Sequence, residues 1–277
     1  MGIFDGAVLF CDIDGTLVEN GTIPQRNIEK IEFFIKEGGI FLLATGRHFT
    51  GNYDLVNAIN GLSLAVVLNG GMIYDYSTNE IIDEITLPKT DYHYVLDVLK
   101  SGFDCGIEVH SGKRVFTLRQ NKNTDEHQHS QKLETTVLTY DEAKEFNWNK
   151  VIFMLNGPED YEKIASLIDT TYANSCFMPT CTYIYGKKCD YFEQVPLNVS
   201  KEVGMSRLCE ILKTEKGKCF AIGDYYNDLT MLKNADISAT TAEAPNEIKQ
   251  QADFVGGSCK NGAVADFIEY LTQIFTN

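Results

Sequence analysis

The chain has 277 residues, of which 44% are hydrophobic, and a formal net charge of −15 at pH 7. That apolar content is enough to bury a sizeable core and excludes intrinsic disorder as the main state. The negative charge argues against nucleic-acid partners, which demand a basic surface, and against docking on anionic lipid. No run of about 18 apolar residues occurs, so we expect no membrane span.

The N-terminal residues and the cysteines indicate the compartment. The first residues lack the charged and apolar regions of a signal peptide. The eight cysteines follow neither a disulfide framework nor a zinc-ribbon spacing. We therefore expect a cytoplasmic protein, and nothing in the sequence points to an obligate protein partner.

The first part of the chain alternates strands and helices. Continuous apolar runs predict strands buried on both faces at 7–11, 40–44 and 64–68. Apolar residues at helical spacing predict helices between them, at 24–36 and 53–59. Pro24 suits a first helical turn, and Gly38-Gly39 ends that helix. This alternation is typical of a doubly wound α/β sheet.

The pattern becomes mixed after Gly71. A hairpin is expected at 72–87, and the stretch that follows predicts helices near 91–100 and 161–168. Strands are expected near 106–109, 115–118 and 150–155, with two more flanking Gly186 to Lys188, while the polar stretch 120–131 is predicted as a helix or a loop. We interpret residues 87–192 as a separate α+β domain inserted into a core formed by 1–86 and 193–277.

The alternation of the core resumes after the insertion. We expect strands at 219–222 and 237–239 and helices at 200–212, 228–233 and 263–275. The predicted fold class is therefore α/β, with a Rossmann-like, doubly wound parallel sheet and an inserted α+β domain.

Chemically reactive side chains follow the ends of the core strands. Asp12 and Asp14 come directly after the first strand, where a doubly wound sheet binds its ligand. One carboxylate can attack phosphorus while the other donates and withdraws a proton. Alone, such a pair is more typical of a solvated turn, since Asp and Gly are common turn residues. Other motifs at the same sheet edge favour the catalytic interpretation.

Three further motifs reach that edge. Thr45 and the Gly46 amide follow the second strand and suit an oxyanion site, although a Thr there also serves as an ordinary helix cap. Lys201 opens a helix and suits a phosphate clamp, or is a surface lysine. Asp224 and Asp228 follow the 219–222 strand and complete a cluster of four carboxylates. Oxygen ligands without His or Cys select Mg²⁺, which also offsets the charge of a phosphate.

The ordered set of motifs resembles the haloacid dehalogenase superfamily, specifically its Cof-type phosphatases with a large inserted cap. The resemblance rests on residues 12–17, 44–47, 199–201 and 223–228, and Asn69-Gly70-Gly71 matches the step after the third strand. Asn198 stands where the family usually has Gly, a position that Asn tolerates because it accepts a left-handed backbone. Tyr225 and Glu243 depart from the residues common there, which leaves substrate preference open.

The resemblance implies a role for each matching residue. Asp12 would be the nucleophile that forms an aspartyl-phosphate, and Asp14 the general acid and then base. Thr45, Gly46, Lys201 and Asn227 would bind the phosphate, and Asp228 would support the metal shell or orient Lys201. Mg²⁺ would bind Asp12, the main-chain carbonyl of Asp14, and Asp224. Arg47 is expected near either the phosphate or the cap.

Residues of the inserted domain allow more than one interpretation. His127 and His129 alternate in a polar stretch, where a surface loop is favoured over a metal site. His110 follows a predicted strand and is expected to pack there or to face the cleft. The basic pairs at 113–114 and 187–188 are expected to be solvated hairpin tips rather than a second anion site.

The function predicted from the sequence is Mg²⁺-dependent hydrolysis of small phosphomonoesters, with sugar phosphates as the first substrate class by resemblance. Two alternatives stay open. A phosphosugar mutase shares the two-aspartate start, and a non-catalytic regulator that binds a phosphometabolite could use the same fold.

Overall fold

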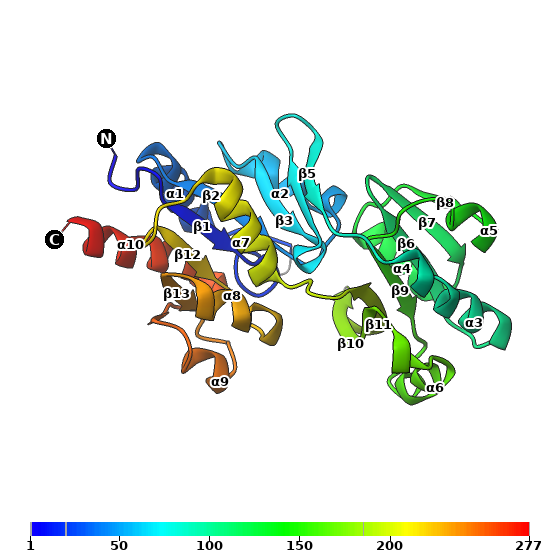
Figure 1. Cartoon of the computed structure of the whole chain (residues 1–277). Helices are drawn as coiled ribbons and strands as arrows, with labels where there is room; N and C mark the ends of the chain where they lie inside the picture. Colours follow the sequence, from blue (N-terminus) through cyan, green and yellow to red (C-terminus); the bar gives the residue numbers. More distant parts are fainter. Residues whose placement is uncertain (1, 20, 185, 277) are drawn as a thin grey trace. The chain divides into compact units, whose positions relative to one another are not determined.

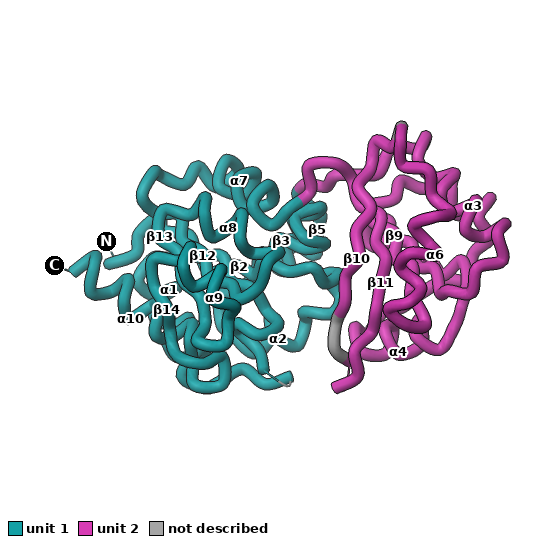
Figure 2. Tube along the Cα trace, turned by 90° about the horizontal axis from the view of Figure 1, so that it is seen from below, with its two compact units in different colours: residues 1–82, 200–277 teal, residues 83–199 magenta. Residues whose placement is uncertain are grey.

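The computed structural model describes residues 2–19, 21–184 and 186–276. The chain divides into two compact units, one formed by residues 1–82 and 200–277 and the other by residues 83–199 (Figure 2). The sequence analysis placed these boundaries at 86/87 and 192/193. The second expected boundary falls inside a strand that continues to Pro196, which moves it toward the C-terminus.

The first unit is built on an eight-stranded sheet (Figure 1). In spatial order its strands are β14 (Phe254–Val255), β13 (Ile237–Thr240), β12 (Cys219–Ile222), β1 (Val8–Cys11), β2 (Ile40–Ala44), β3 (Leu64–Val67), β4 (Met72–Asp75) and β5 (Glu80–Glu84). Neighbouring strands from β14 to β3 are parallel, and β4 is antiparallel to β3. The predicted doubly wound α/β sheet is confirmed, and its five predicted strands agree to within one residue at each end.

Helices cover both faces of this sheet. They are α1 (Gln25–Lys36), α2 (Tyr53–Ala58), α7 (Lys201–Leu212), α8 (Leu229–Asn234), α9 (Asn246–Lys249) and α10 (Ala263–Thr276), with short 3-10 turns η1 (Phe49–Asn52), η2 (Leu68–Gly70), η5 (Tyr226–Asp228) and η6 (Cys259–Asn261). Residues of α1, α2 and α10 share a core with Leu9 and Cys11 of β1. Residues of α7, α8 and α9 pack with Val8 and Phe10, which point to the opposite face.

The sequence explains how α1 forms and what it buries. Pro24 precedes its first residue, and Gly38 leaves it with a φ of 93°, a backbone region that glycine enters without strain. Ile31 and Phe34 lie on one side of the helix and are fully buried in the core. Replacing Phe34 with Ala would cost about 3–5 kcal/mol, because the sheet could not collapse into the cavity.

The order of the strands determines where a ligand would bind. The chain passes from β1 to β2 and β3 on one side, while β12, β13 and β14 lie on the other side of β1. The strand order therefore reverses between β1 and β12. In open α/β sheets the binding crevice lies beyond the carboxyl ends of the strands at such a reversal.

The second unit contains a six-stranded sheet with the spatial order β10 (Ser175–Ile184), β11 (Lys187–Pro196), β9 (Lys150–Met154), β6 (Gly106–Ser111), β7 (Arg114–Arg119) and β8 (Thr135–Val137). All neighbouring pairs are antiparallel except β7 and β8. Its helices are α3 (His93–Ser101), α4 (Lys122–Ser130), α5 (Tyr140–Ala143) and α6 (Asp160–Leu167), with η3 (Lys89–Asp91) and η4 (Thr170–Tyr172). Residues of α3 and α6 pack with one face of the sheet around the buried Trp148.

Two features of the second unit differ from expectation or resolve an alternative. The polar stretch at 120–131 is a helix, α4, held at its start by a capping box between Asn121 and Thr124. β8 and α5 were not predicted, because segments of three and four residues are too short to show a period.

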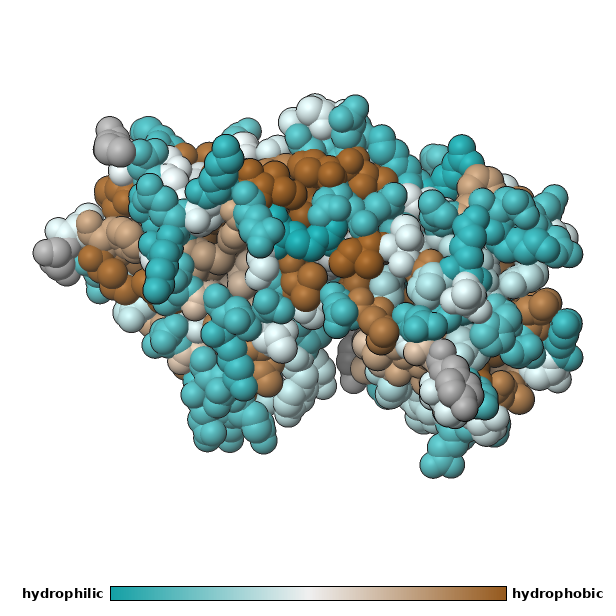
Figure 3. Space-filling view, in the orientation of Figure 1, coloured by the Kyte–Doolittle hydropathy of each residue, from teal (hydrophilic) through white to brown (hydrophobic). Residues whose placement is uncertain are grey.

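The surface agrees with the composition. Hydrophilic residues cover much of the face seen in Figure 3, in keeping with the net charge of −15. Among the described residues, no helix combines the length and the apolar character needed to cross a bilayer.

Candidate active site

The turn after β1 places two carboxylates differently. Asp12 is 7% exposed, and its N–H donates to the Ile222 carbonyl at 2.9 Å, which continues the pairing of β1 with β12. Asp14 is the next residue but one, and its side chain is 63% exposed. One acid of the predicted pair is therefore enclosed and the other open to solvent.

Gly15 allows this turn to approach Asp224 closely. Its φ is 86°, and a Cβ added there would lie 2.5 Å from Asp224 Oδ2. The next residue, Thr16, is buried and donates from Oγ1 to Asp224 Oδ1 at 2.9 Å. The turn that carries Asp12 and Asp14 therefore also holds the Asp224 carboxylate, through Thr16.

Lys201 bridges two buried carboxylates. Its Nζ lies 2.5 Å from Asp12 Oδ1 and 2.6 Å from Asp228 Oδ1, and its side chain is 1% exposed. It is the first residue of α7, which Ser200 caps by accepting the Val203 N–H at 3.2 Å. The ammonium opposes the helix dipole, but two carboxylates within hydrogen-bond distance outweigh that small effect.

Two glycines bring the start of α7 to this place. A Cβ at Gly70 would lie 1.9 Å from the Ser200 carbonyl oxygen, and one at Gly204 would lie 2.3 Å from Val66 Cγ1. Side chains at either position would push α7 away from the end of β3. Before the helix, Asn198 adopts a φ of 61°, the left-handed conformation expected for the residue that replaces the usual Gly.

Asp228 is fully buried and holds the loop after β12. Its Oδ2 accepts the N–H groups of Asp224 and Tyr225, both at 3.1 Å. Gly223 makes room for it, since a Cβ there would lie 2.4 Å from Asp228 Cγ. Asp228 therefore orients both Lys201 and the Asp224 loop, and its support of a metal shell stays a prediction.

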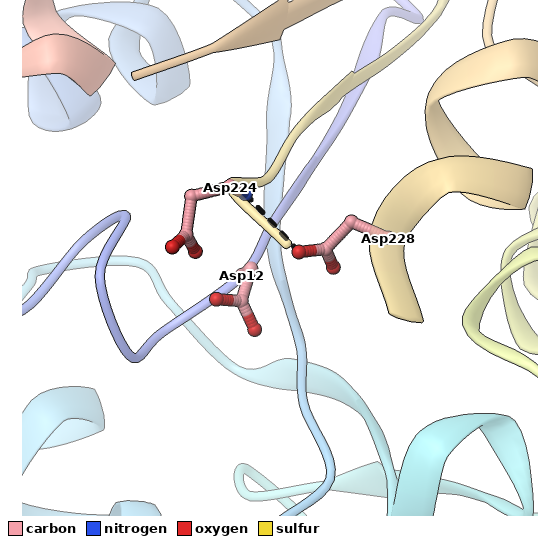
Figure 4. A group of neighbouring side chains, drawn as sticks. All are labelled: Asp12, Asp224 and Asp228. Atoms are coloured by element: carbon pink, nitrogen blue, oxygen red, sulfur yellow. Dashed lines mark hydrogen bonds between the residues drawn. The ribbon is translucent and has the colours of Figure 1, made fainter. Parts of the chain in front are cut away.

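Three carboxylates converge at this point, as Figure 4 shows for Asp12, Asp224 and Asp228. Each offers a ligand atom, and these atoms lie within 4.8 Å of one another. We call Asp12, Asp224, Asp228 and Lys201 the carboxylate cluster. It holds three acids and one cation, so ionisation of all three leaves a surplus of negative charge.

The surplus charge is visible in the pKa values. Burial, and then repulsion from Asp228 and Asp224, raises the pKa of Asp12 well above its usual range despite the attraction of Lys201. Burial and the neighbouring Asp228 raise the pKa of Asp224 to about 6. Burial alone would lower the pKa of Lys201, but Asp12 and Asp228 outweigh it and raise that pKa. A divalent cation would offset the repulsion between these carboxylates.

Arg47 has a partner that the sequence analysis did not anticipate. Its Nε donates to Asp14 Oδ2 at 2.9 Å, and its Nη2 donates to Asp14 Oδ1. Its backbone N–H donates to the buried Thr45 Oγ1 at 3.2 Å. Arg47 was expected near the phosphate or the cap. Its guanidinium pairs with the exposed Asp14 carboxylate, and its place relative to the phosphate stays a prediction.

Two residues outside the predicted set border the site. Thr16 contacts Asp224 as described above. Asn69, with a φ of 55°, lies against Gly46, where an added Cβ would be 2.9 Å from its Oδ1. That Oδ1 is buried and has no hydrogen-bond partner among the described residues. The sequence feature that pointed to Asn69 was the Asn69-Gly70-Gly71 motif after the third strand.

The other predicted site residues lie as follows. Thr45 and Gly46 follow β2 directly, at the same sheet edge as the carboxylates. Asn227 is on η5 between Asp224 and Asp228 and is exposed. In the second unit, His127 is buried and lies 2.8 Å from Glu108 Oε2, so the preference for a surface loop was wrong.

Comparison with known proteins identifies what the chain resembles. The family described as haloacid dehalogenase-like hydrolase matches residues 9–268. A 5-amino-6-(5-phospho-D-ribitylamino)uracil phosphatase of Bacillus subtilis is 24% identical over 282 residues, covering 94% of this chain and 96% of the relative. A pyridoxal phosphate phosphatase of Escherichia coli is 22% identical over 283 residues, covering 94% and 97%.

A solved structure agrees at the level of the fold. A haloacid dehalogenase-like hydrolase from Bacteroides thetaiotaomicron superposes with a TM-score of 0.81 at 22% identity, covering 96% of this chain and 99% of that one. The resemblance stated from the motifs is confirmed by the family match, and with it the expectation of a hydrolytic enzyme.

Proposed function

Because the chain belongs to the haloacid dehalogenase-like hydrolases, we propose that it is a phosphatase that hydrolyses small phosphomonoesters with Mg²⁺, through a phosphoryl group carried on Asp12. The observation that carries the proposal is the carboxylate cluster. A buried Asp12 fixed by Lys201 at 2.5 Å, with two more acids beside it, suits an acidic nucleophile in a cation site. The cluster lies where the strand order reverses.

The donor set fits Mg²⁺. Its members are oxygen ligands, and their surplus negative charge and raised pKa values support a divalent cation at the site. Asp12, Asp224 and the main-chain carbonyl of Asp14 would hold the ion, with Asp228 supporting the shell. Bound Mg²⁺ would neutralise phosphate charge in the transition state.

The residues of the chain would carry out two displacements. In the first, a carboxylate oxygen of Asp12 attacks phosphorus and the bond to the leaving oxygen breaks, while Asp14 gives that oxygen a proton. In the second, Asp14 takes a proton from water, whose oxygen attacks phosphorus and releases phosphate from Asp12. Such proton transfer contributes typically about 10²–10⁴-fold. Arg47 fixes the direction of the Asp14 carboxylate through its paired hydrogen bonds.

Binding of the phosphoryl group is assigned to the residues around the cluster. Thr45, the Gly46 amide, Asn227 and Lys201 would contact its oxygens. Lys201 already holds Asp12 and Asp228, so it would align the nucleophile and offset the charge of the phosphoryl group at once. In-line positioning and charge neutralisation would then supply most of the acceleration.

The substrate and the second unit complete the proposal. Sugar phosphates and similar phosphometabolites are the proposed substrates, supported by the relative that acts on a phosphorylated ribityl compound. We assign residues 83–199 as the cap that selects the leaving group. A cytoplasmic location fits such substrates and the cysteine usage.

The test measures phosphate release from a panel of sugar phosphates, nucleotides and an aryl phosphate, with Mg²⁺ and with chelator. We expect metal-dependent release with a preferred substrate, and none from an Asp12→Asn variant. Transfer that requires a bisphosphate activator would favour the mutase. Binding of a phosphometabolite without release would favour the regulator, and either result would overturn the proposal.

A further inference from the structure

Two cysteine thiols of the first unit lie almost in contact. Cys209 is in the second half of α7, and Cys219 is the first residue of β12. Their Sγ atoms are 3.4 Å apart, although residues 210–218 separate them along the chain. Both are partly exposed, so a small oxidant in solvent can reach them.

The surroundings give the two thiols different reactivity. The hydrogen bond with Cys219 lowers the pKa of Cys209 despite its burial, and Thr214 adds to this effect. The same contact, together with burial and the charge of Asp236, raises the pKa of Cys219. The proton of the pair thus stays with Cys219, and Cys209 is the more nucleophilic sulfur because the thiolate is the reactive form.

We propose that Cys209 and Cys219 are a site of reversible oxidative modification, at which a peroxide or a small-molecule disulfide converts the two thiols to one disulfide. With peroxide, the Cys209 thiolate takes one oxygen to give a sulfenic acid and hydroxide. The Cys219 thiol then attacks that sulfur, the S–S bond forms, and water leaves. With a small disulfide, the Cys209 thiolate forms a mixed disulfide and releases one small thiolate, and Cys219 then displaces the second small thiol as the S–S bond forms.

The position of the pair predicts what the bond would change. α7 begins at Lys201, and the loop that holds Asp224 and Asp228 follows β12, so the same two elements position three members of the carboxylate cluster at their other ends. Cys209 lies about 12 Å along the helix from Lys201, at the usual rise of about 1.5 Å per residue. The bond would therefore tie the connection between α7 and β12 and leave the cluster in place.

The backbone of that connection indicates how a disulfide would affect the stability of the fold. It contains two residues with positive φ, Lys213 at 55° and Gly217 at 88°, and Lys213 is the left-handed end of α7. Closing this loop removes conformational entropy from the unfolded chain. Oxidation is therefore expected to raise the melting temperature by roughly 5 °C and to change turnover by less than about twofold.

The experiment treats the reduced full chain with hydrogen peroxide or with glutathione disulfide, then maps peptides by mass spectrometry. The 209–219 disulfide should appear with a mass loss of about 2 Da and return to thiols with dithiothreitol. In Cys219→Ser, Cys209 should stop as a sulfenic acid that dimedone traps, or as a glutathione adduct.

Two controls keep the result specific. A Cys176→Ser, Cys181→Ser variant removes the partly and fully exposed thiols of the second unit and should oxidise at 209–219 unchanged. The Cys209→Ser, Cys219→Ser variant should show no gain in melting temperature on oxidation. Both thiols remaining free while Cys176 or Cys181 reacts would overturn the proposal. None of these readouts depends on phosphatase activity.

Discussion

The two units both bury charged side chains, but they balance the charge differently. In the second unit, Glu108 receives hydrogen bonds from His127 at 2.8 Å and Gln128 at 2.6 Å, and Lys150 pairs with Glu193 at 2.7 Å. In the first unit, Lys201 pairs with two of the three acids of the carboxylate cluster, Asp12 and Asp228. Buried charges that each have a partner stabilise an arrangement, whereas a surplus of one sign indicates a ligand of the other.

The nucleophile variant should give the largest effect. Asp12→Asn removes the attacking carboxylate, so turnover should fall by about 10⁴-fold or more. The amide keeps the shape and relieves the repulsion that raises the pKa of Asp12. The Mg²⁺-free variant should therefore unfold at the same or a higher urea concentration than the parent chain. Retained turnover, by a sample checked for unchanged mass, would refute the assignment of the nucleophile.

Removing one buried ammonium from each unit tests the comparison directly. Lys201→Met leaves Asp12 and Asp228 unpaired, and Lys150→Met leaves Glu193 unpaired. Each should lower the free energy of unfolding by about 3–5 kcal/mol, because an uncompensated charge stays buried. Lys201→Met should also lose about 10²–10³-fold in turnover.

Mg²⁺ separates these two variants. It binds beside the acids that Lys201 held, so it should restore part of the stability of Lys201→Met in urea unfolding. Among the residues that the structure describes, no such group of acids includes Glu193, so Mg²⁺ should leave the deficit of Lys150→Met unchanged. If Mg²⁺ restored the stability of both variants equally, or of neither, the carboxylate cluster would not be the specific Mg²⁺ site.

The pH dependence of Mg²⁺ binding should show the surplus charge. Folding raises the pKa of Asp224 from 3.8 to about 6, so its contribution to stability is complete below its ordinary pKa and is lost as the pH rises through about 6. Mg²⁺ needs the ionised carboxylates. The rise in melting temperature on adding Mg²⁺ should therefore grow between pH 5 and pH 8. Asp224→Asn should remove most of that growth; a pH-independent rise in the parent chain would contradict this account.

The sequence predicted the positions at which topology alone brings residues together. Asp12, Thr45 and Asp224 follow the ends of parallel strands, and parallel strands end at one edge, so their approach needed no knowledge of side-chain contacts. Lys201 was predicted only through the set of motifs, since a lysine that opens a helix is more often a surface residue. Its burial depends on the contact between Gly70 and Gly204, which no local pattern shows.

The contacts that the sequence did not predict depend on a distant partner. Arg47 follows β2, and the sequence could not show that its guanidinium would pair with Asp14. His127 lies in a polar helix, and polar stretches are usually solvated; the buried Glu108 on β6, which receives its hydrogen bond, made it an exception. Periodicity treats every polar residue as exposed, so it misses polar residues that are buried as a pair.

The smallest effect is expected where a buried acid already has hydrogen-bond partners. Glu108→Gln keeps an oxygen for Gln128 or His127 but loses the charge-assisted hydrogen bond at 2.8 Å. The free energy of unfolding should fall by about 1–2 kcal/mol, with turnover and the Mg²⁺-induced rise in melting temperature unchanged. Asp228→Asn is the matched change in the first unit and should reduce both of those quantities. If Glu108→Gln weakened Mg²⁺ binding as strongly as Asp228→Asn, the buried acids of the second unit would also belong to the functional site. The presence of a partner for a buried acid would then not tell a structural acid from one that binds a ligand.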